Sequence, residues 1–207
     1  MTLHVRPRHI ATFACAALLC LSAQADRAAE PQPIDVLRAQ VAAGIELLDH
    51  PDYDDPTRQA EQRERLCDIA NEMFDVHAFS RLVLMSGWKS MSSAEQEEFV
   101  TVFGDFLCRY YLSRLQMYYA DEQLKFASQE FRSDTQARVS ASVVWRGTEI
   151  PFEVRMVYRE GRWRAFDIAV SGISAVLIYR AQFQPVLFKE SPRALIEDLR
   201  QRIAEEG

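Results

Sequence analysis

Residues 139–170 read VSASVVWRGTEIPFEVRMVYREGRWRAFDIAV, and apolar and polar side chains alternate along most of this stretch. An alternation with a period of two is typical of half-buried β-strands. Arg146-Gly147-Thr148 and Glu160-Gly161 interrupt the pattern at places where a glycine can turn the chain. The stretch therefore predicts antiparallel hairpins in series that form a strongly curved sheet, and a weaker alternation over residues 124–131 predicts one strand before them.

Apolar residues recur at helical spacing on both sides of this sheet. The predicted helices begin at Ile34, at about Thr57, at Phe74, after Ser92, at Ala175 and after Ser191. Gly87 is expected to end the third of them. Ser92 and Glu95 have the spacing of a capping box, which predicts the start of a helix of about 25 residues with a wide aromatic face. The predicted fold class is α+β, with helices first, a curved antiparallel meander sheet next, and helices last.

The first 25 residues have the pattern of a secretory signal peptide. Arg6 and Arg8 form a basic start, and residues 10–21 form an uncharged apolar run that is too short to span a bilayer as a permanent helix. Small residues end the segment, which predicts cleavage near Ala25. Residues 26–33 are small and polar and predict a disordered lead, and residues 34–207 predict a single domain.

The formal net charge of the chain limits the kinds of partner that the protein is expected to bind. Cleavage after Ala25 would remove two arginines and no acidic residue, so the formal net charge would change from −6 to −8. An acidic protein is a poor binder of nucleic acid, and it is not attracted to anionic lipid surfaces by its bulk charge. A partner or ligand is therefore expected to use a local patch or a pocket.

Two cysteines, Cys67 and Cys108, follow the predicted signal peptide. In an oxidising compartment an even number of cysteines invites a disulfide, and closing a loop of about 40 residues would contribute about 4 kcal/mol. Alternatively, both are small buried hydrophobic residues on separate helices. The sequence leaves the two interpretations open. It contains no CxxC, no Cys/His cluster and no HExxH, so neither a metal site nor a cofactor is predicted.

Three residues are candidates for acid–base catalysis, namely Asp75, His77 and Asp167. Asp75 precedes a predicted helix, where aspartate commonly caps the first turn. His77 is expected to lie half-exposed on that helix. Asp167 has the opposite parity to Phe166 and Ile168 on a predicted strand, so it is expected to face outward if they face the core. No nucleophile elbow, phosphate-binding loop or dinucleotide fingerprint is present, and no enzyme is predicted.

Two interpretations fit the aromatic helix faces and the apolar face of the sheet. Phe and Leu at helical spacing usually form a filled core, which would suit a structural adaptor in an envelope complex. The same surfaces can enclose a deep apolar pocket. Ser171, Gly172, Ser174 and Ala175 are small and leave space between the last long strand and the closing helix. Composition alone does not decide between core and cavity.

Three motifs in a fixed order resemble those of the MlaC-like family of exported phospholipid-binding proteins, also called the toluene-tolerance or ABC-transport auxiliary family. They read FDVHAFSRLVLMSGW over residues 74–88, QEEFVTVFGDFLCRY over residues 96–110 and WRAFDIAVSGISAVLIYRAQF over residues 163–183. The resemblance spans about residues 34–203. Two positions depart from the usual pattern, because Ile178 stands where many members have a polar residue and Phe166 replaces a tyrosine.

The resemblance implies an NTF2-like fold, in which a curved sheet is wrapped by helices around an apolar cavity that holds acyl chains. It also implies a periplasmic phospholipid shuttle that serves an MCE/ABC lipid transport system associated with outer-membrane lipid asymmetry. Nothing in the sequence demands more than a monomer. The expected partners are an inner-membrane MCE-domain protein with its ABC transporter and an outer-membrane lipoprotein complex. The alternatives are a hopanoid-associated lipid-binding protein of the same family and an NTF2-like exported enzyme.

On this hypothesis, apolar and aromatic side chains of the helices and the sheet line the cavity. The expected lining residues are Leu84, Trp88, Phe99, Phe103, Phe106, Tyr110, Val143, Trp145, Phe152, Val154, Met156, Ile168, Val170, Ile173, Val176, Tyr179 and Phe183. Arg81 and Arg180 are the candidates for binding the phosphate of a headgroup, since a guanidinium pairs with phosphate through two hydrogen bonds. The alternative for either arginine is a surface salt bridge.

Overall fold

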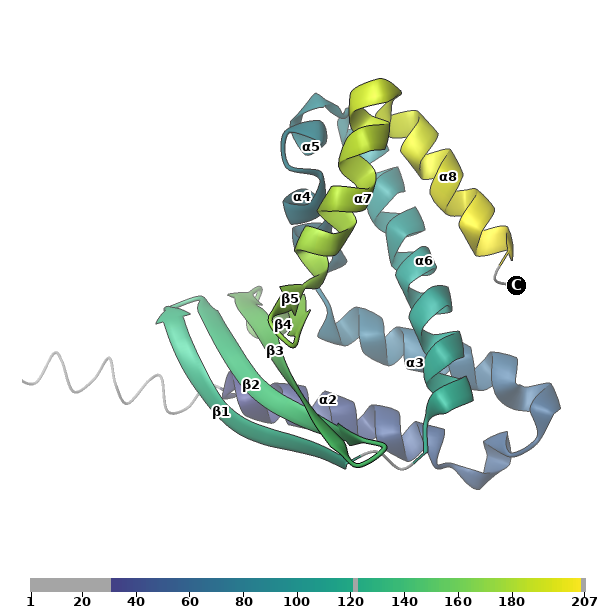
Figure 1. The fold of residues 1–207 in the computed structure, drawn as a ribbon, viewed down its shortest axis with the longest axis vertical. Helices are drawn as coiled ribbons and strands as arrows, with labels where there is room; N and C mark the ends of the chain where they lie inside the picture. The colour runs from purple at the N-terminus through teal and green to yellow at the C-terminus, as the bar shows by residue number, and fades with distance from the viewer. Residues whose placement is uncertain (1–30, 121–122, 206–207) are drawn as a thin grey trace, which may run out of the picture. The chain divides into compact units, whose positions relative to one another are not determined.

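The computed structural model describes residues 31–120 and 123–205. The predicted signal peptide, and residues 26–30 of the predicted lead, lie outside the described residues. Inter-residue contacts divide the chain after Gln32, and every element considered below belongs to the unit Pro33–Gly207. Figure 1 shows how the elements of this unit are arranged.

Helices come first in the unit, followed by a sheet and then by two closing helices, in agreement with the α+β prediction (Figure 1). The leading elements are α2 (Pro33–Leu48), the 3₁₀ turns η1 (Pro51–Tyr53) and η2 (Pro56–Arg58), α3 (Gln59–Met73), α4 (Val76–Leu84), α5 (Ser86–Ser90) and α6 (Ser93–Tyr118). The strands are β1 (Gln123–Ser133), β2 (Gln136–Trp145), β3 (Thr148–Arg159), β4 (Arg162–Val170) and β5 (Ile173–Ser174). The closing helices are α7 (Ala175–Lys189) and α8 (Pro192–Glu205).

The strands form an antiparallel sheet in the order β1-β2-β3-β4-β5, so the predicted meander is confirmed. Two-residue turns join β2 to β3 and β3 to β4. In both turns a residue and the glycine after it have positive φ, 49° and 77° at Arg146-Gly147 and 54° and 77° at Glu160-Gly161. This is the pattern of a type I′ turn, whose twist matches that of the strands, and glycine accepts the second position without a steric penalty.

The capping box predicted at the start of α6 is present. The Glu95 N–H donates to Ser92 Oγ over 3.3 Å, and the Ser92 N–H donates to Glu95 Oε2 over 2.8 Å. The hydrogen bonds from the Ser92 backbone and then from its hydroxyl lower the pKa of the Glu95 carboxyl. Helix α6 is 26 residues long and reaches two parts of the unit. Its N-terminal half packs beside α4 and α8, and its C-terminal half meets α3 (Figure 1).

Residues 74–88 depart from the predicted single helix. Met85 has a φ of 52° and divides the segment into α4 and α5, and Gly87 lies inside α5 rather than at a helix end. A Cβ at Gly87 would lie 2.9 Å from Leu187 Cδ1 of α7, so a side chain there would require the end of the Leu187 side chain to shift. A positive φ at a residue other than glycine is uncommon, and the helical periodicity of the sequence does not signal it.

A first cluster of buried side chains joins α4 and α6 to α7 and α8. Aromatic rings form its centre, where Phe103 contacts Phe79, Phe99, Tyr179 and Phe183 at centroid distances of 5.1 to 5.5 Å. Burial raises the pKa of the Tyr179 phenol, whose hydroxyl donates to that of Tyr111 over 3.0 Å. A second cluster joins α2 to the sheet and contains Leu37, Ala137, Val139, Val154, Met156, Trp163 and Ala165.

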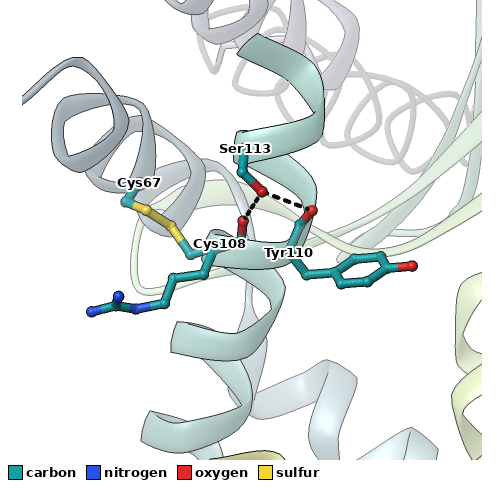
Figure 2. Close-up of a disulfide and its surroundings, with 5 residues drawn as sticks. Cys67, Cys108, Tyr110 and Ser113 are labelled. Carbon is teal, nitrogen blue, oxygen red and sulfur yellow. Dashed lines mark hydrogen bonds between the residues drawn. A yellow bond between two sulfur atoms is a disulfide. The ribbon is translucent and has the colours of Figure 1, made fainter. Parts of the chain in front are cut away.

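A disulfide between Cys67 of α3 and Cys108 of α6 links these two helices (Figure 2). The two Cα atoms lie 5.6 Å apart, within the usual range of about 4.4–6.8 Å. Nearby, the side-chain amide of Gln116 in α6 donates to Gln62 Oε1 in α3 over 2.8 Å. Of the two interpretations that the sequence left open, the structure has the bonded one, and α3 is held along the C-terminal half of α6.

Asp167 of β4 is fully buried, which corrects the prediction that it faces outward. The prediction was wrong because both faces of β4 are covered. Ile168 packs against the second cluster, on the side of α2, whereas α4 and α7 cover the opposite face, where Asp167 lies. A register shift opposite Phe166 also interrupts the alternation on which the prediction relied.

The carboxylate of Asp167 binds the start of α7. Its Oδ2 accepts a hydrogen bond from Ser174 Oγ over 2.7 Å, and its Oδ1 accepts one from the Val176 N–H over 3.1 Å. Ser174 Oγ in turn accepts from the Leu177 N–H over 3.3 Å, and Arg155 Nη1 lies 3.2 Å from Asp167 Oδ2. Two otherwise unpaired N–H groups of the first helical turn are therefore satisfied, and a negative charge lies at the positive end of the helix.

Replacing both cysteines with serine (C67S/C108S) is expected to lower the free energy of unfolding by about 4 kcal/mol, because the bond closes a loop with a sequence separation of 41. Urea denaturation followed by circular dichroism measures the difference. The control is reduction with dithiothreitol, which should destabilise the native sequence and leave the serine variant unchanged. Equal stability of the oxidised, reduced and serine forms would contradict this expectation.

Asp167→Ala is expected to destabilise the protein by about 3 kcal/mol, because it leaves Ser174 and the first turn of α7 without their buried acceptor. Thermal and urea unfolding measure this loss. Arg155→Gln is the matched control, since the half-exposed arginine is expected to contribute at most about 1 kcal/mol. A loss for Arg155→Gln as large as that for Asp167→Ala would show that the ion pair, not the capping of α7, stabilises the junction.

Candidate functional site

An apolar cavity of about 440 Å³ lies between the sheet and the helices α2, α3 and α6. This volume falls within the range of about 300–1,000 Å³ that is typical of pockets for small ligands. The lining residues are Gln40, Val41, Gly44, Ile45, Leu48, Leu66, Ile69, Ala70, Met73, Leu112, Leu115, Tyr118, Tyr119, Leu124, Val143, Trp145 and Phe152.

The lining of this cavity offers almost no polar group. Apart from Gln40, its side chains are aliphatic or aromatic, and none of them is charged. The Tyr119 hydroxyl is directed to Asp49 Oδ2, at 3.3 Å. Gln40 Oε1 is buried and has no hydrogen-bond partner among the described residues. A ligand here would be held by burial of its own apolar surface.

The opening of the cavity is marked by large apolar side chains that line it and are also exposed to solvent. They are Leu115 and Tyr118 of α6 and Trp145 of β2. Exposed apolar groups that lie together are typical of surfaces that meet a ligand or a partner. The guanidinium of Arg146 lies 4.6 Å from the centroid of the Trp145 ring, so a cation stands beside this part of the opening.

The structure brings three of the predicted lining residues into this cavity, namely Val143, Trp145 and Phe152. Most of the others lie in the two clusters of buried side chains. The first cluster contains Leu84, Trp88, Phe99, Phe103, Phe106, Val176, Tyr179 and Phe183, with Tyr110 packed against it. The second contains Val154 and Met156, with Ile168 packed against it. Val170 and Ile173 are exposed beside the turn between β4 and β5.

The closing helix α7 therefore contributes to a filled core. Its Tyr179 and Phe183 are buried, and both rings contact Phe103. Ser171 and Gly172, where small residues suggested free space, form a third two-residue turn with positive φ, 49° and 82°. Small residues at this position shape a turn between two strands.

The helical wall of the cavity was not among the predicted lining residues. It is formed by apolar side chains of α2 and α3, together with Leu112 and Leu115 of α6. Gly44 contributes by lacking a side chain, since a Cβ there would meet no atom within 4 Å. A glycine between Val41 and Leu48, on the apolar face of an amphipathic helix, is the sequence signal that could have indicated free space.

A second groove, of about 820 Å³, lies between the opposite face of the sheet and the helices α4, α5 and α7. We call it the basic groove, because its charged lining residues are Arg81, Lys89, Arg132, Arg138, Arg155, Arg159, Arg180 and the single acid Asp167. Both headgroup candidates, Arg81 and Arg180, line the basic groove, and neither lines the apolar cavity. Arg180 donates from Nε and Nη2 to the Leu82 carbonyl over 3.2 and 2.7 Å, which ties α7 to the last turn of α4.

The three candidates for acid–base catalysis each contribute to the fold. Asp75 caps α4 by accepting from the Ala78 N–H over 2.8 Å, and it pairs with Arg159 at 3.2 Å. The exposed His77 ring makes an edge contact with Trp88, with centroids 5.0 Å apart. Asp167 binds the start of α7, as described above.

Within residues 31–120 and 123–205, no group of three or more His, Cys, Asp or Glu side chains is placed to hold a metal ion. Among the same residues, no helix combines the length and the apolar character needed to cross a membrane.

Comparison with known proteins places the chain in a family. No curated protein matches it. A solved structure of the phospholipid-binding protein from Ralstonia solanacearum, in complex with a phospholipid, is similar with a TM-score of 0.67 and 18% sequence identity, covering 81% of this chain and 97% of that chain. At this identity the likeness shows a shared fold. The MlaC protein family matches residues 39–201. Because this match covers most of the chain, the protein belongs to the MlaC family.

Proposed function

We propose that the protein binds a phospholipid by enclosing its acyl chains in the apolar cavity, and that it carries the lipid between the inner and outer membranes. The cavity itself is the observation that carries this proposal, because its lining is aliphatic and aromatic and contains no charged side chain. Membership of the MlaC family supports it. So does the fold shared with a protein whose structure was determined in complex with a phospholipid.

Burial of the acyl chains supplies the affinity. Each methylene moved from water into the cavity contributes about 0.8 kcal/mol. A bilayer offers the same methylene nearly the same gain, so the cavity retains lipid in water without favouring its extraction from a membrane. Net transfer then depends on partners that deliver and accept the lipid, for which we propose an MCE-domain protein with its ABC transporter and an outer-membrane lipoprotein complex.

The headgroup is expected to remain at the opening of the cavity, because burial of an unpaired phosphate is costly. Arg146 stands beside the opening at Trp145 and can pair with a phosphate there. Arg81 and Arg180 line the separate basic groove, so this proposal assigns them no contact with the headgroup.

We propose the periplasm as the compartment and binding without catalysis as the activity. The signal-peptide pattern of residues 1–25 supports the compartment, as does the disulfide, since disulfides persist in oxidising compartments. Binding without catalysis is supported by the roles of Asp75 and Asp167, because both carboxylates accept hydrogen bonds from the first turn of a helix.

Native mass spectrometry of the protein, purified from the periplasm after expression of the full chain, is expected to show adducts of phospholipid mass. Extraction and tandem mass spectrometry of the adducts identify the lipid. A polycyclic lipid instead would assign the protein to the hopanoid-associated branch. A bare polypeptide mass that persists after incubation with phospholipid vesicles would contradict lipid binding and favour a structural adaptor.

Gly44→Phe is expected to remove bound lipid without unfolding the protein, because the ring would occupy free space at the α2 wall of the cavity. Gly44→Ala is the matched control. It adds one methyl group, should keep its lipid, and should raise stability by about 0.5–1 kcal/mol because glycine is unfavourable inside a helix. The lipid-to-protein ratio from a phosphorus assay and the Tm are measured side by side. A full lipid load in Gly44→Phe would show that the ligand lies elsewhere.

A further inference from the structure

The basic groove has the opposite charge to the chain as a whole. The chain carries 30 acidic and 24 basic residues, whereas seven cationic side chains and one acidic side chain line the groove. The cations come from α4 and α5, from three strands or their connections, and from α7. The acid, Asp167, is buried and pairs with Arg155 at 3.2 Å, so it balances one of the seven cations.

Arginines face each other across neighbouring strands of the sheet, an arrangement that lowers the stability of the fold. Arg138 of β2 lies directly opposite Arg155 of β3, and Arg159 of β3 lies opposite Arg162 of β4. Like charges directly opposite each other in an antiparallel pair are destabilising. Arg138, Arg155 and Arg159 each have one carboxylate partner, at 3.2 to 3.4 Å. A guanidinium has five N–H donors, so one carboxylate does not exhaust them.

The helical side of the groove adds unpaired charge and apolar surface together. The exposed Arg81 and Lys89 side chains have no ion-pair partner within the described part of the chain. Leu82 of α4, Met85 and Leu177 of α7 also line the groove and are 39%, 51% and 56% exposed. A site for a small free anion needs no such apolar side chains, so the groove suits a larger ligand that carries both kinds of group.

We propose that the basic groove is a docking site for an acidic segment of a partner protein, one that also carries apolar side chains. Carboxylates of the segment would pair with the arginines, where a guanidinium can hold a carboxylate through two hydrogen bonds. Apolar side chains of the segment would cover Leu82, Met85 and Leu177. Complementary charge across such an interface speeds encounter and selects the partner.

A membrane surface fits the groove less well. The acidic charge of the whole chain opposes an anionic surface. The groove and the apolar cavity share no lining residue. The docking proposal therefore stands apart from the proposed function, and either can fail without the other.

The test uses protein purified after expression of the full chain and two fluorescein-labelled helical peptides of equal length and charge. One peptide carries Glu and Leu on opposite faces, and serine replaces the leucines in the other. Fluorescence anisotropy measures the Kd of each. The Glu/Leu peptide is expected to bind more tightly than the Glu/Ser peptide, and its affinity is expected to fall with salt, because exposed charges are screened beyond about 10 Å at 0.1 M.

Arg81→Glu combined with Lys89→Glu reverses the two unpaired cations and is expected to raise the Kd for the Glu/Leu peptide about tenfold or more. Arg63→Glu combined with Arg109→Glu makes the same change of net charge on α3 and α6, outside the groove lining, and should leave the Kd within about twofold. Gly44→Phe should bind the peptide as the native protein does, which separates docking from lipid binding. Circular dichroism confirms that each variant is folded.

Equal losses of affinity in the two double variants would reveal a bulk-charge effect and overturn the proposal. So would two peptides that bind equally, or a Glu/Leu peptide that does not bind. Sedimentation with phosphatidylcholine vesicles that contain phosphatidylglycerol tests the membrane alternative. The proposal would also be overturned if the native protein sedimented with the vesicles, the Arg81→Glu/Lys89→Glu variant did not, and the Glu/Leu peptide failed to bind.

A photo-crosslinking amino acid at position 89 captures the natural partner in cells, with the same amino acid at position 63 as the control. The expected product joins position 89, and not position 63, to a peptide rich in Asp and Glu. A product with a lipid, or with a peptide poor in acidic residues, would overturn the proposal.

Discussion

The buried carboxylate of Asp167 connects the sheet to the closing helices. It lies on β4 and accepts hydrogen bonds from Ser174 and from the backbone of Val176, so β4 determines where α7 begins. From that start, α7 delivers Tyr179 and Phe183 to the aromatic cluster around Phe103. A charge that is buried this deeply is stable only when its hydrogen bonds are complete, which restricts α7 to a direction that satisfies them. The basic groove, one wall of which is α7, inherits its shape from this contact.

Helix α6 takes part in both the filled and the hollow region of the molecule. Phe99 and Phe103, near its N-terminus, are fully buried against α4, α7 and α8. Leu112 and Leu115, further along, line the apolar cavity. Atoms around a void lose packing contacts, so the hollow region is less stable than a filled one of equal size. The dense aromatic packing at one end of α6 and the disulfide near its middle offset that loss.

Local patterns predicted most of the elements, whereas the site depends on tertiary contacts. The alternation over residues 139–170 and the two glycine turns specify the hairpins, and Ser92 with Glu95 specifies the start of α6. The positive φ of Met85 has no such local signal, so the division between α4 and α5 was missed. An aromatic stripe at helical spacing looks the same whether it meets another ring or free space. Parity along β4 likewise reveals neither the register shift opposite Phe166 nor the helices that cover Asp167.

The disulfide between α3 and α6 has a mechanical consequence for the cavity. Both helices line it, so a covalent bond sets the separation of two of its walls. The third helical wall, α2, is held through side-chain amides at its two ends. The Ile34 N–H donates to Gln129 Oε1 at one end, and Gln62 Nε2 donates to the Leu47 and Leu48 carbonyls at the other. Each of the three helical walls of the cavity is therefore fastened to a neighbouring element, α3 and α6 to each other by the disulfide, and α2 to the sheet at one end and to α3 at the other.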